Sequence, residues 1–240
     1  MKKIALALMA VVLFIACKKE DHGDANLHIK GNIKGLSQGK LYIQKVVDTS
    51  FVSMDTIVIN DKKGFESHLK IDEPQMLYLV LDRGQTSSID NVLPFFAEPG
   101  NMTIESSNEE FFKRAKITGS KNQKVYEDFL KIKSRFTDDN LDLEKQGLLA
   151  AQYGNVKKLD SVEAKQLKLE ERKYLYTLNF AVQHADLEVA PYLLLTETQK
   201  INTVYLDTLQ KKMTPKVAKS LYGKMLSELI AQRKKAAAAQ

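Results

Sequence analysis

The chain has a single cysteine, Cys17, and so a single thiol for redox or nucleophilic chemistry. One cysteine excludes an intramolecular disulfide, a CxxC redox pair and a cysteine zinc cluster. Cys17 directly follows the uncharged segment 4–16, which is itself preceded by Lys2-Lys3. This segment is too short to span a bilayer, which takes about 20 residues, and has the length of the apolar part of a signal peptide.

The end of this segment, Phe14-Ile15-Ala16-Cys17, resembles a bacterial lipobox that is cleaved before Cys17. The resemblance implies a diacylglycerol on the Cys17 sulfur and a further acyl chain, such as palmitate, on the new amino group. Two or more acyl chains give stable membrane attachment. We therefore predict a lipoprotein signal peptide at 1–16, lipidation at Cys17 and a flexible polar tether at 17–25. An ordinary secretory signal with an incidental cysteine is the alternative.

The other residue types that could do chemistry are scattered. The histidines show neither HExxH nor His-x3-His spacing, and His28 and His68 are interpreted as surface residues of one sheet. Neighbouring carboxylates point in different directions on a strand or helix, and Ser87-Ser88 lacks the GxSxG elbow. We predict no catalytic residue, no cofactor and no metal site. The histidines and acidic pairs are His22, His28, His68, His184, Glu109-Glu110, Asp138-Asp139 and Glu170-Glu171.

Composition restricts the class of protein. With 44% hydrophobic and 28% charged residues, the 240-residue chain has the usage of a globular protein, which argues against general disorder. The net charge is +6, but both signs alternate along the chain. This mixture indicates a solvated surface, so we expect no nucleic-acid partner.

The segment 26–119 has β patterning. Phe65, Ser67 and Leu69 alternate with polar residues, which predicts a half-buried strand. The segment 76–81 is apolar throughout and predicts a central strand covered on both faces, and Pro94 indicates an edge strand or a bulge. About eight such strands predict an antiparallel β-sandwich or an open barrel, between which the sequence does not decide.

The segment 120–240 has helical patterning, so the fold class is α+β. Ser120 is a candidate N-cap for one helix and Asn155 for a long helix that ends near Gln183. Further helices are predicted at 192–197, from Asn202, and from 216 to about 237 after the cap Thr214. We predict a β domain at 26–119 followed by a helical region at 120–240.

Several motifs in the β segment resemble the domain of unknown function 4369 of Bacteroidetes lipoproteins. They are Met54-Asp55-Thr56, the segments 63–69 and 96–104, and Ile117-Thr118-Gly119-Ser120-Lys121-Asn122. In that family the domain usually precedes helices and a thioredoxin-like domain of the AhpC/TSA type. The sequence ends at Gln240, where that domain would begin, so we expect it to be missing.

These observations predict a protein of the cell envelope without enzymatic activity. We expect an outer-membrane lipoprotein, periplasmic or surface-exposed, that contacts the membrane through its lipid and binds a ligand or partner. The first alternative is an accessory protein that docks a separate thioredoxin-like protein in envelope thiol–disulfide or cytochrome-maturation-type pathways. The second is an enzyme whose site forms only in three dimensions.

Overall fold

The computed structural model describes residues 23–60, 64–84, 88–197 and 203–238. The predicted signal peptide, the lipidation site Cys17 and most of the 17–25 tether lie outside these residues. Among the described helices, none combines the length and the apolar composition that crossing a bilayer would take.

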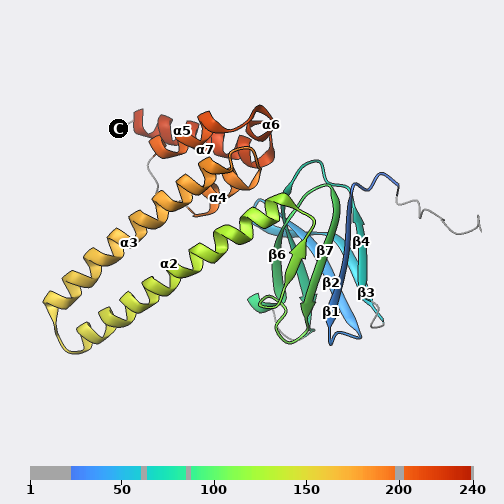
Figure 1. The fold of residues 1–240 in the computed structure, drawn as a ribbon, viewed down its shortest axis with the longest axis horizontal. Helices are drawn as coiled ribbons and strands as arrows, with labels where there is room; N and C mark the ends of the chain where they lie inside the picture. The colour runs from blue at the N-terminus through green and yellow to red at the C-terminus, as the bar shows by residue number, and fades with distance from the viewer. Residues whose placement is uncertain (1–22, 61–63, 85–87, 198–202, 239–240) are drawn as a thin grey trace, which may run out of the picture.

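The β segment forms two four-stranded sheets that pack face to face (Figure 1). The first, sheet A, has the strand order β4-β1-β7-β8, and the second, sheet B, has the order β3-β2-β5-β6. The predicted sandwich is therefore confirmed over the open barrel. Sheet A contains β1 (Leu27–Lys34), β4 (Phe65–Leu69), β7 (Gly100–Ser107) and β8 (Lys116–Thr118), and sheet B contains β2 (Gly39–Val47), β3 (Ser50–Ile59), β5 (Gln75–Asp82) and β6 (Val92–Ala97).

One strand pair departs from the antiparallel prediction. β1 and β7 are parallel, with Leu27 opposite Gly100 and Lys34 opposite Ser107, while every other neighbouring pair is antiparallel. The two strands begin at the same end of sheet A, where the Gly100 N–H donates to the Asn26 carbonyl over 2.8 Å. The alternation of buried and exposed residues along a strand does not depend on the direction of its neighbour, so the sequence of β1 or β7 alone could not predict this pairing.

The core lies between the two sheets and consists of alternate residues of each strand. Phe65, Ser67 and Leu69 all point into it, as the alternation predicted. β5 is an inner strand of sheet B and β6, which carries Pro94, is an edge strand, as predicted. The predicted cover on both faces of β5 holds only at Met76, because Tyr78 and Val80 on the outer face are partly exposed. The short 3-10 helix η2 (Ile89–Asn91) leads into β6.

The helical region begins with a long antiparallel hairpin of α2 (Lys121–Gln152) and α3 (Val156–Gln183), which extends away from the sandwich (Figure 1). Both predicted caps are confirmed. The Ser120 hydroxyl accepts from the Gln123 N–H over 2.9 Å, and the Asn155 side chain accepts from the Lys158 N–H over 3.0 Å. The remaining helices are α4 (Val189–Glu197), α5 (Thr203–Lys212), α6 (Pro215–Ala218) and α7 (Leu221–Ala238).

The prediction of one helix from 216 to about 237 is wrong, because α6 and α7 are separate. Thr214 caps α6 as expected, but the chain leaves the helix at Lys219. A second N-terminus then forms, where the Glu73 carboxylate accepts from the Leu221 N–H over 2.7 Å. Gly223 permits the close contact between the two helices, because a Cβ there would lie 2.0 Å from the Val217 carbonyl oxygen. The predicted helix start at Asn202 lies outside the described residues.

Candidate functional site

The helical region packs on the outer face of sheet B. Because side chains alternate along a strand, Leu77 of β5 faces the sandwich core while Met76 faces the helices. Phe96 of β6 also faces the helices, and both side chains are buried there. We name this second core the junction cluster; its buried members are Met76, Phe96, Phe129, Val189, Leu193 and Tyr222.

Tyrosines surround the junction cluster. Tyr192 of α4 lies 5.0 Å from Tyr222 of α7 and 6.0 Å from Tyr126 of α2, measured between ring centroids. The Tyr222 hydroxyl accepts from the Met76 N–H over 2.9 Å, which joins α7 to β5. Burial raises the pKa of Tyr126 and of Tyr222 to about 12. Burial also places the pKa of Tyr192 far above its ordinary value, so these phenols are neutral at physiological pH.

A cleft of about 620 Å³ opens beside these tyrosines, between sheet B and the helices α4 and α7. We name it the junction cleft. Apolar side chains predominate in its lining, and Val46, Val47 and Met225 are each more than 40% exposed along it. Such a cleft suits an apolar group. Its lining includes Val46, Val47, Met76, Tyr78, Tyr192, Leu195, Leu221, Tyr222 and Met225.

Two polar side chains that line the junction cleft, Glu73 and Thr196, have structural partners. The Glu73 carboxylate accepts from the backbone at the start of α7. The Thr196 hydroxyl donates to the Tyr192 carbonyl over 3.0 Å, within its own helix. Within the part of the chain that the structure describes, no three His, Cys, Asp or Glu side chains are placed to hold a metal ion together.

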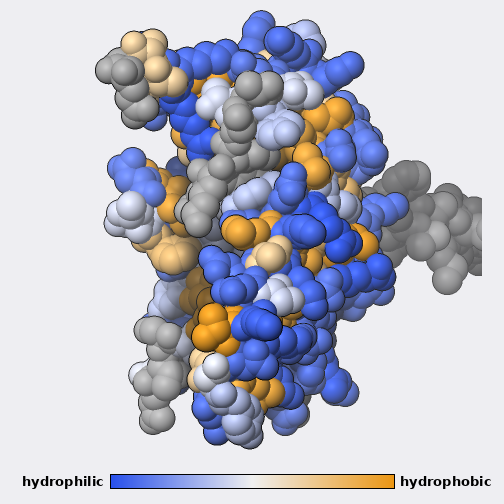
Figure 2. Space-filling model, turned by 90° about the vertical axis from the view of Figure 1, so that its left-hand side faces the viewer, coloured by the Kyte–Doolittle hydropathy of each residue, from blue (hydrophilic) through white to orange (hydrophobic). Residues whose placement is uncertain are grey.

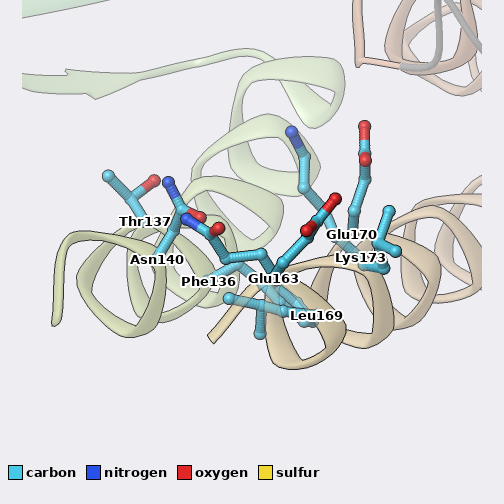
Figure 3. Close-up of a pocket in the computed structure, with 9 residues that line it drawn as sticks. Phe136, Thr137, Asn140, Glu163, Leu169, Glu170 and Lys173 are labelled. Atoms are coloured by element: carbon cyan, nitrogen blue, oxygen red, sulfur yellow. The ribbon is translucent and has the colours of Figure 1, made fainter. Parts of the chain in front are cut away.

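A second groove, of about 430 Å³, runs along the α2–α3 hairpin. Figure 3 shows that its side chains come from both helices, including Thr137 and Asn140 of α2 and Glu163 and Lys173 of α3. Lys173 also lies 3.9 Å from the Glu197 carboxylate. This hairpin groove is the more polar of the two, so it is less suited to an apolar ligand.

A buried polar network connects the sandwich to the helices. The Glu98 carboxylate, after β6, accepts from the first two N–H groups of α2 over 2.8 and 3.3 Å and from the Asn122 side-chain amide over 2.9 Å. The same amide donates to Glu188 over 3.1 Å, and the Asn122 carbonyl oxygen accepts from the Val189 N–H over 2.8 Å. Burial acts to raise the pKa of Glu98, but these hydrogen bonds hold it below its ordinary value.

Sequence reasoning missed this Glu98–Asn122–Glu188 network. It identified Glu98 and Asn122 within motifs and interpreted those motifs as turns and a helix start. The structure shows that the two motifs meet, and that Gln123 of the same segment accepts from the N–H of Phe96 on the edge strand β6 over 2.7 Å. The available signal was a polar residue next to each turn, Glu98 before Pro99-Gly100 and Asn122 after Gly119-Ser120.

The residues singled out from the sequence lie far apart, with one exception. His28 and His68 face each other on neighbouring strands, as expected for one sheet. His184 packs against the Phe180 ring with centroids 4.7 Å apart. Of the acidic pairs, Glu110 contacts Lys113 and Arg114, and Glu170 accepts from the Tyr174 hydroxyl. Cys17, His22 and Ser87 lie outside the described residues.

Residues 27–126 match the family model described as a domain of unknown function (DUF4369). The match covers all strands of the sandwich and the first turns of α2, and so includes both motifs that build the Glu98–Asn122–Glu188 network. The resemblance stated from the sequence is thereby confirmed for this domain. A search of curated proteins finds no match to the chain.

Proposed function

We propose that this chain, with its DUF4369 domain at residues 27–126, is a lipid-anchored protein of the cell envelope that binds a ligand or partner without enzymatic activity. The observation that carries the proposal is the junction cleft, an open and mainly apolar cavity bordered by the neutral Tyr192 and Tyr222. An apolar cavity of several hundred Å³ with a few hydroxyls is typical of a binding site.

The polar chemistry at this cleft supports binding over catalysis. The Tyr222 hydroxyl is occupied by the Met76 N–H, and the Glu73 carboxylate is occupied by the start of α7. A general base must be able to reach a proton of the substrate. The Tyr222 hydroxyl and the Glu73 carboxylate hold backbone N–H groups of the protein itself, so their role is to stabilise the junction between the sheet and the helices.

The proposed anchor is Cys17, at the end of the signal-peptide pattern. A thioether to diacylglycerol would hold the protein at an outer-membrane surface and leave no free thiol for disulfide exchange. The test is metabolic labelling with a palmitate analogue, followed by detergent phase partition. The parent chain should carry the label and enter the detergent phase, and Cys17→Ser should lose both properties. Retention of the label by Cys17→Ser would contradict the anchor.

Binding at the junction cleft can be tested with the fluorescent apolar probe 8-anilinonaphthalene-1-sulfonate. The apparent affinity for the probe is measured from the fluorescence increase on titration. We expect Met225→Glu, which places a charge beside the cleft, to weaken that affinity at least about tenfold, because a charge in an apolar site is costly to desolvate. Leu148→Glu is the matched control, since Leu148 is 74% exposed and lies on the hairpin. Equal binding by the parent and both variants would refute this site.

A second candidate function is docking of a separate thioredoxin-like protein. It is favoured by the distal part of the hairpin, where Leu141, Leu148 and Leu167 are each more than half exposed. Site-specific photocrosslinkers at Leu148 and, as a control, at Lys116 of β8 distinguish the two candidates in intact cells. A crosslink from position 148 to a thioredoxin-fold protein supports docking, and its absence leaves the junction cleft as the proposed site.

A further inference from the structure

Two histidines meet on the outer face of sheet A, away from the junction cleft. His28 of β1 and His68 of β4 are directly opposite each other in the antiparallel register. Their Nδ1 atoms are hydrogen-bonded to each other over 2.9 Å, so one of the two carries a proton, and their ring centroids are 5.1 Å apart. Opposed side chains on neighbouring strands are held at short Cβ separation by the sheet itself, so little ordering is needed to keep the rings together.

Both Nδ1 atoms can bind one metal ion after the proton of their hydrogen bond moves to Nε2 of its own ring and the rings turn slightly away from each other. A metal–imidazole bond is about 2.1 Å long, so two nitrogens this close would make an angle of about 90° at a shared ion. This is the angle between adjacent ligands in square-planar and octahedral coordination, the geometries of Cu²⁺ and Ni²⁺. We propose that His28 and His68 form a binding site for a divalent late transition metal, with water completing the coordination.

The neighbouring charges favour Nδ1 as the metal-binding atom. The Glu66 carboxylate, two residues before His68 on β4, lies 3.8 Å from the other ring nitrogen of His68, Nε2. A carboxylate beside Nε2 favours the proton there and leaves the lone pair on Nδ1, as outer carboxylates do for metal-binding histidines. The Lys30 ammonium lies 3.0 Å from the same carboxylate, so the negative charge of Glu66 offsets the positive charge of Lys30 beside the site.

Metal at this site would join two strands. β4 is an edge strand of sheet A and pairs only with β1 within that sheet, so an ion shared by His28 and His68 would fasten the edge to its neighbour. A metal that binds the folded chain and not the unfolded chain raises the free energy of unfolding with its concentration. Stabilisation by metal is therefore a readout that is independent of ligand binding at the junction cleft.

The experiment uses the full chain without a polyhistidine tag and with Cys17→Ser in every sample, so that no thiol competes. Cu²⁺ is added, and its affinity and electron paramagnetic resonance spectrum are measured. We expect one equivalent of Cu²⁺ with splitting from two imidazole nitrogens. His28→Ala and His68→Ala should each weaken binding at least about tenfold, since each removes one of the two protein ligands.

Matched controls separate this site from other histidines. His184→Ala removes the histidine on α3 and His22→Ala removes the one nearest the N-terminal segment, and both variants should bind Cu²⁺ as the parent does. Ni²⁺ should raise the melting temperature of the parent and of both controls, and leave that of His68→Ala and of the milder His68→Gln unchanged. Unchanged Cu²⁺ affinity in His28→Ala and His68→Ala, or a spectrum with a single nitrogen, would overturn the proposal.

Discussion

The two ends of the α2–α3 hairpin differ in what they pack against. At the end near the sandwich, Phe129 is 1% exposed and packs against the rings of Tyr176 and Phe180, with centroid distances of 6.0 and 5.5 Å. At the far end, Leu148 and Tyr153 are 74% and 77% exposed. Figure 1 shows why, since the hairpin leaves the sandwich and its tip stands alone. Apolar spacing along a helix therefore does not determine whether those residues are buried.

The far part of the hairpin has a thin core. Its buried apolar residues are Ala150, Val162 and Leu169, none of which belongs to one of the three core clusters. Figure 2, viewed from the side of the hairpin, shows separated hydrophobic patches on a mainly hydrophilic surface. A helix pair with so little buried apolar area opens locally at low free energy. The near part shares the junction cluster with sheet B, so we expect it to unfold together with the sandwich.

The strongest test of this difference is Phe129→Ala against Leu148→Ala. Phe129→Ala should lower the free energy of unfolding by about 3–5 kcal/mol, because it leaves a cavity in the junction cluster. Leu148→Ala should change it by less than about 0.5 kcal/mol, because the side chain is mostly in water. Urea unfolding followed by circular dichroism measures both. Similar losses in the two variants would mean that the hairpin is equally packed along its length.

The Glu98–Asn122–Glu188 network should also be costly to disturb. Asn122→Ala removes the acceptor of the Val189 N–H and one hydrogen-bond donor from each of the Glu98 and Glu188 carboxylates, so we expect a loss of about 1–3 kcal/mol. Asn140→Ala is the control, since Asn140 lies on the hairpin and its amide contacts only Glu144 of the same helix among the hydrogen bonds described. A loss in Asn140→Ala as large as in Asn122→Ala would contradict the role of the network.

The smallest effect concerns alkaline pH. The folded-state pKa of Tyr126 and of Tyr222 is about 12, and a tyrosine in an unfolded chain ionises near 10. Their stabilising contribution is thus fully present below pH 10 and is lost as the pH rises from 10 to 12. Absorbance at 295 nm should show a late phase of tyrosine ionisation that accompanies loss of helical circular dichroism.

Tyr222→Phe sharpens this test, because it removes one of the late-ionising hydroxyls and the acceptor for the Met76 N–H. The late phase should become smaller, and the variant should be about 1 kcal/mol less stable at neutral pH. Tyr153→Phe, at the exposed tip of the hairpin, should leave the late phase unchanged. Ionisation of every tyrosine in one phase near pH 10, with the fold intact, would exclude a buried tyrosine cluster.

The sequence alone determined that a β segment precedes a helical segment, and it located several of the elements within each. The alternation around Phe65 gave β4 its inner face, Pro94 indicated an edge strand, and Ser120 and Asn155 identified two helix starts. These signals are readable because they are local: the pattern of burial along a strand and the capping of a helix depend on residues a few positions apart.

Only the tertiary structure decided the parallel pairing of β1 with β7, the break between α6 and α7, and the meeting of Glu98 with Asn122 and Glu188. It also brought His28 and His68 to within hydrogen-bonding distance. Each of these depends on groups from distant parts of the chain. These contacts depend on how whole sheets and helices pack together, and this packing cannot be predicted from residues that are only a few positions apart in the sequence.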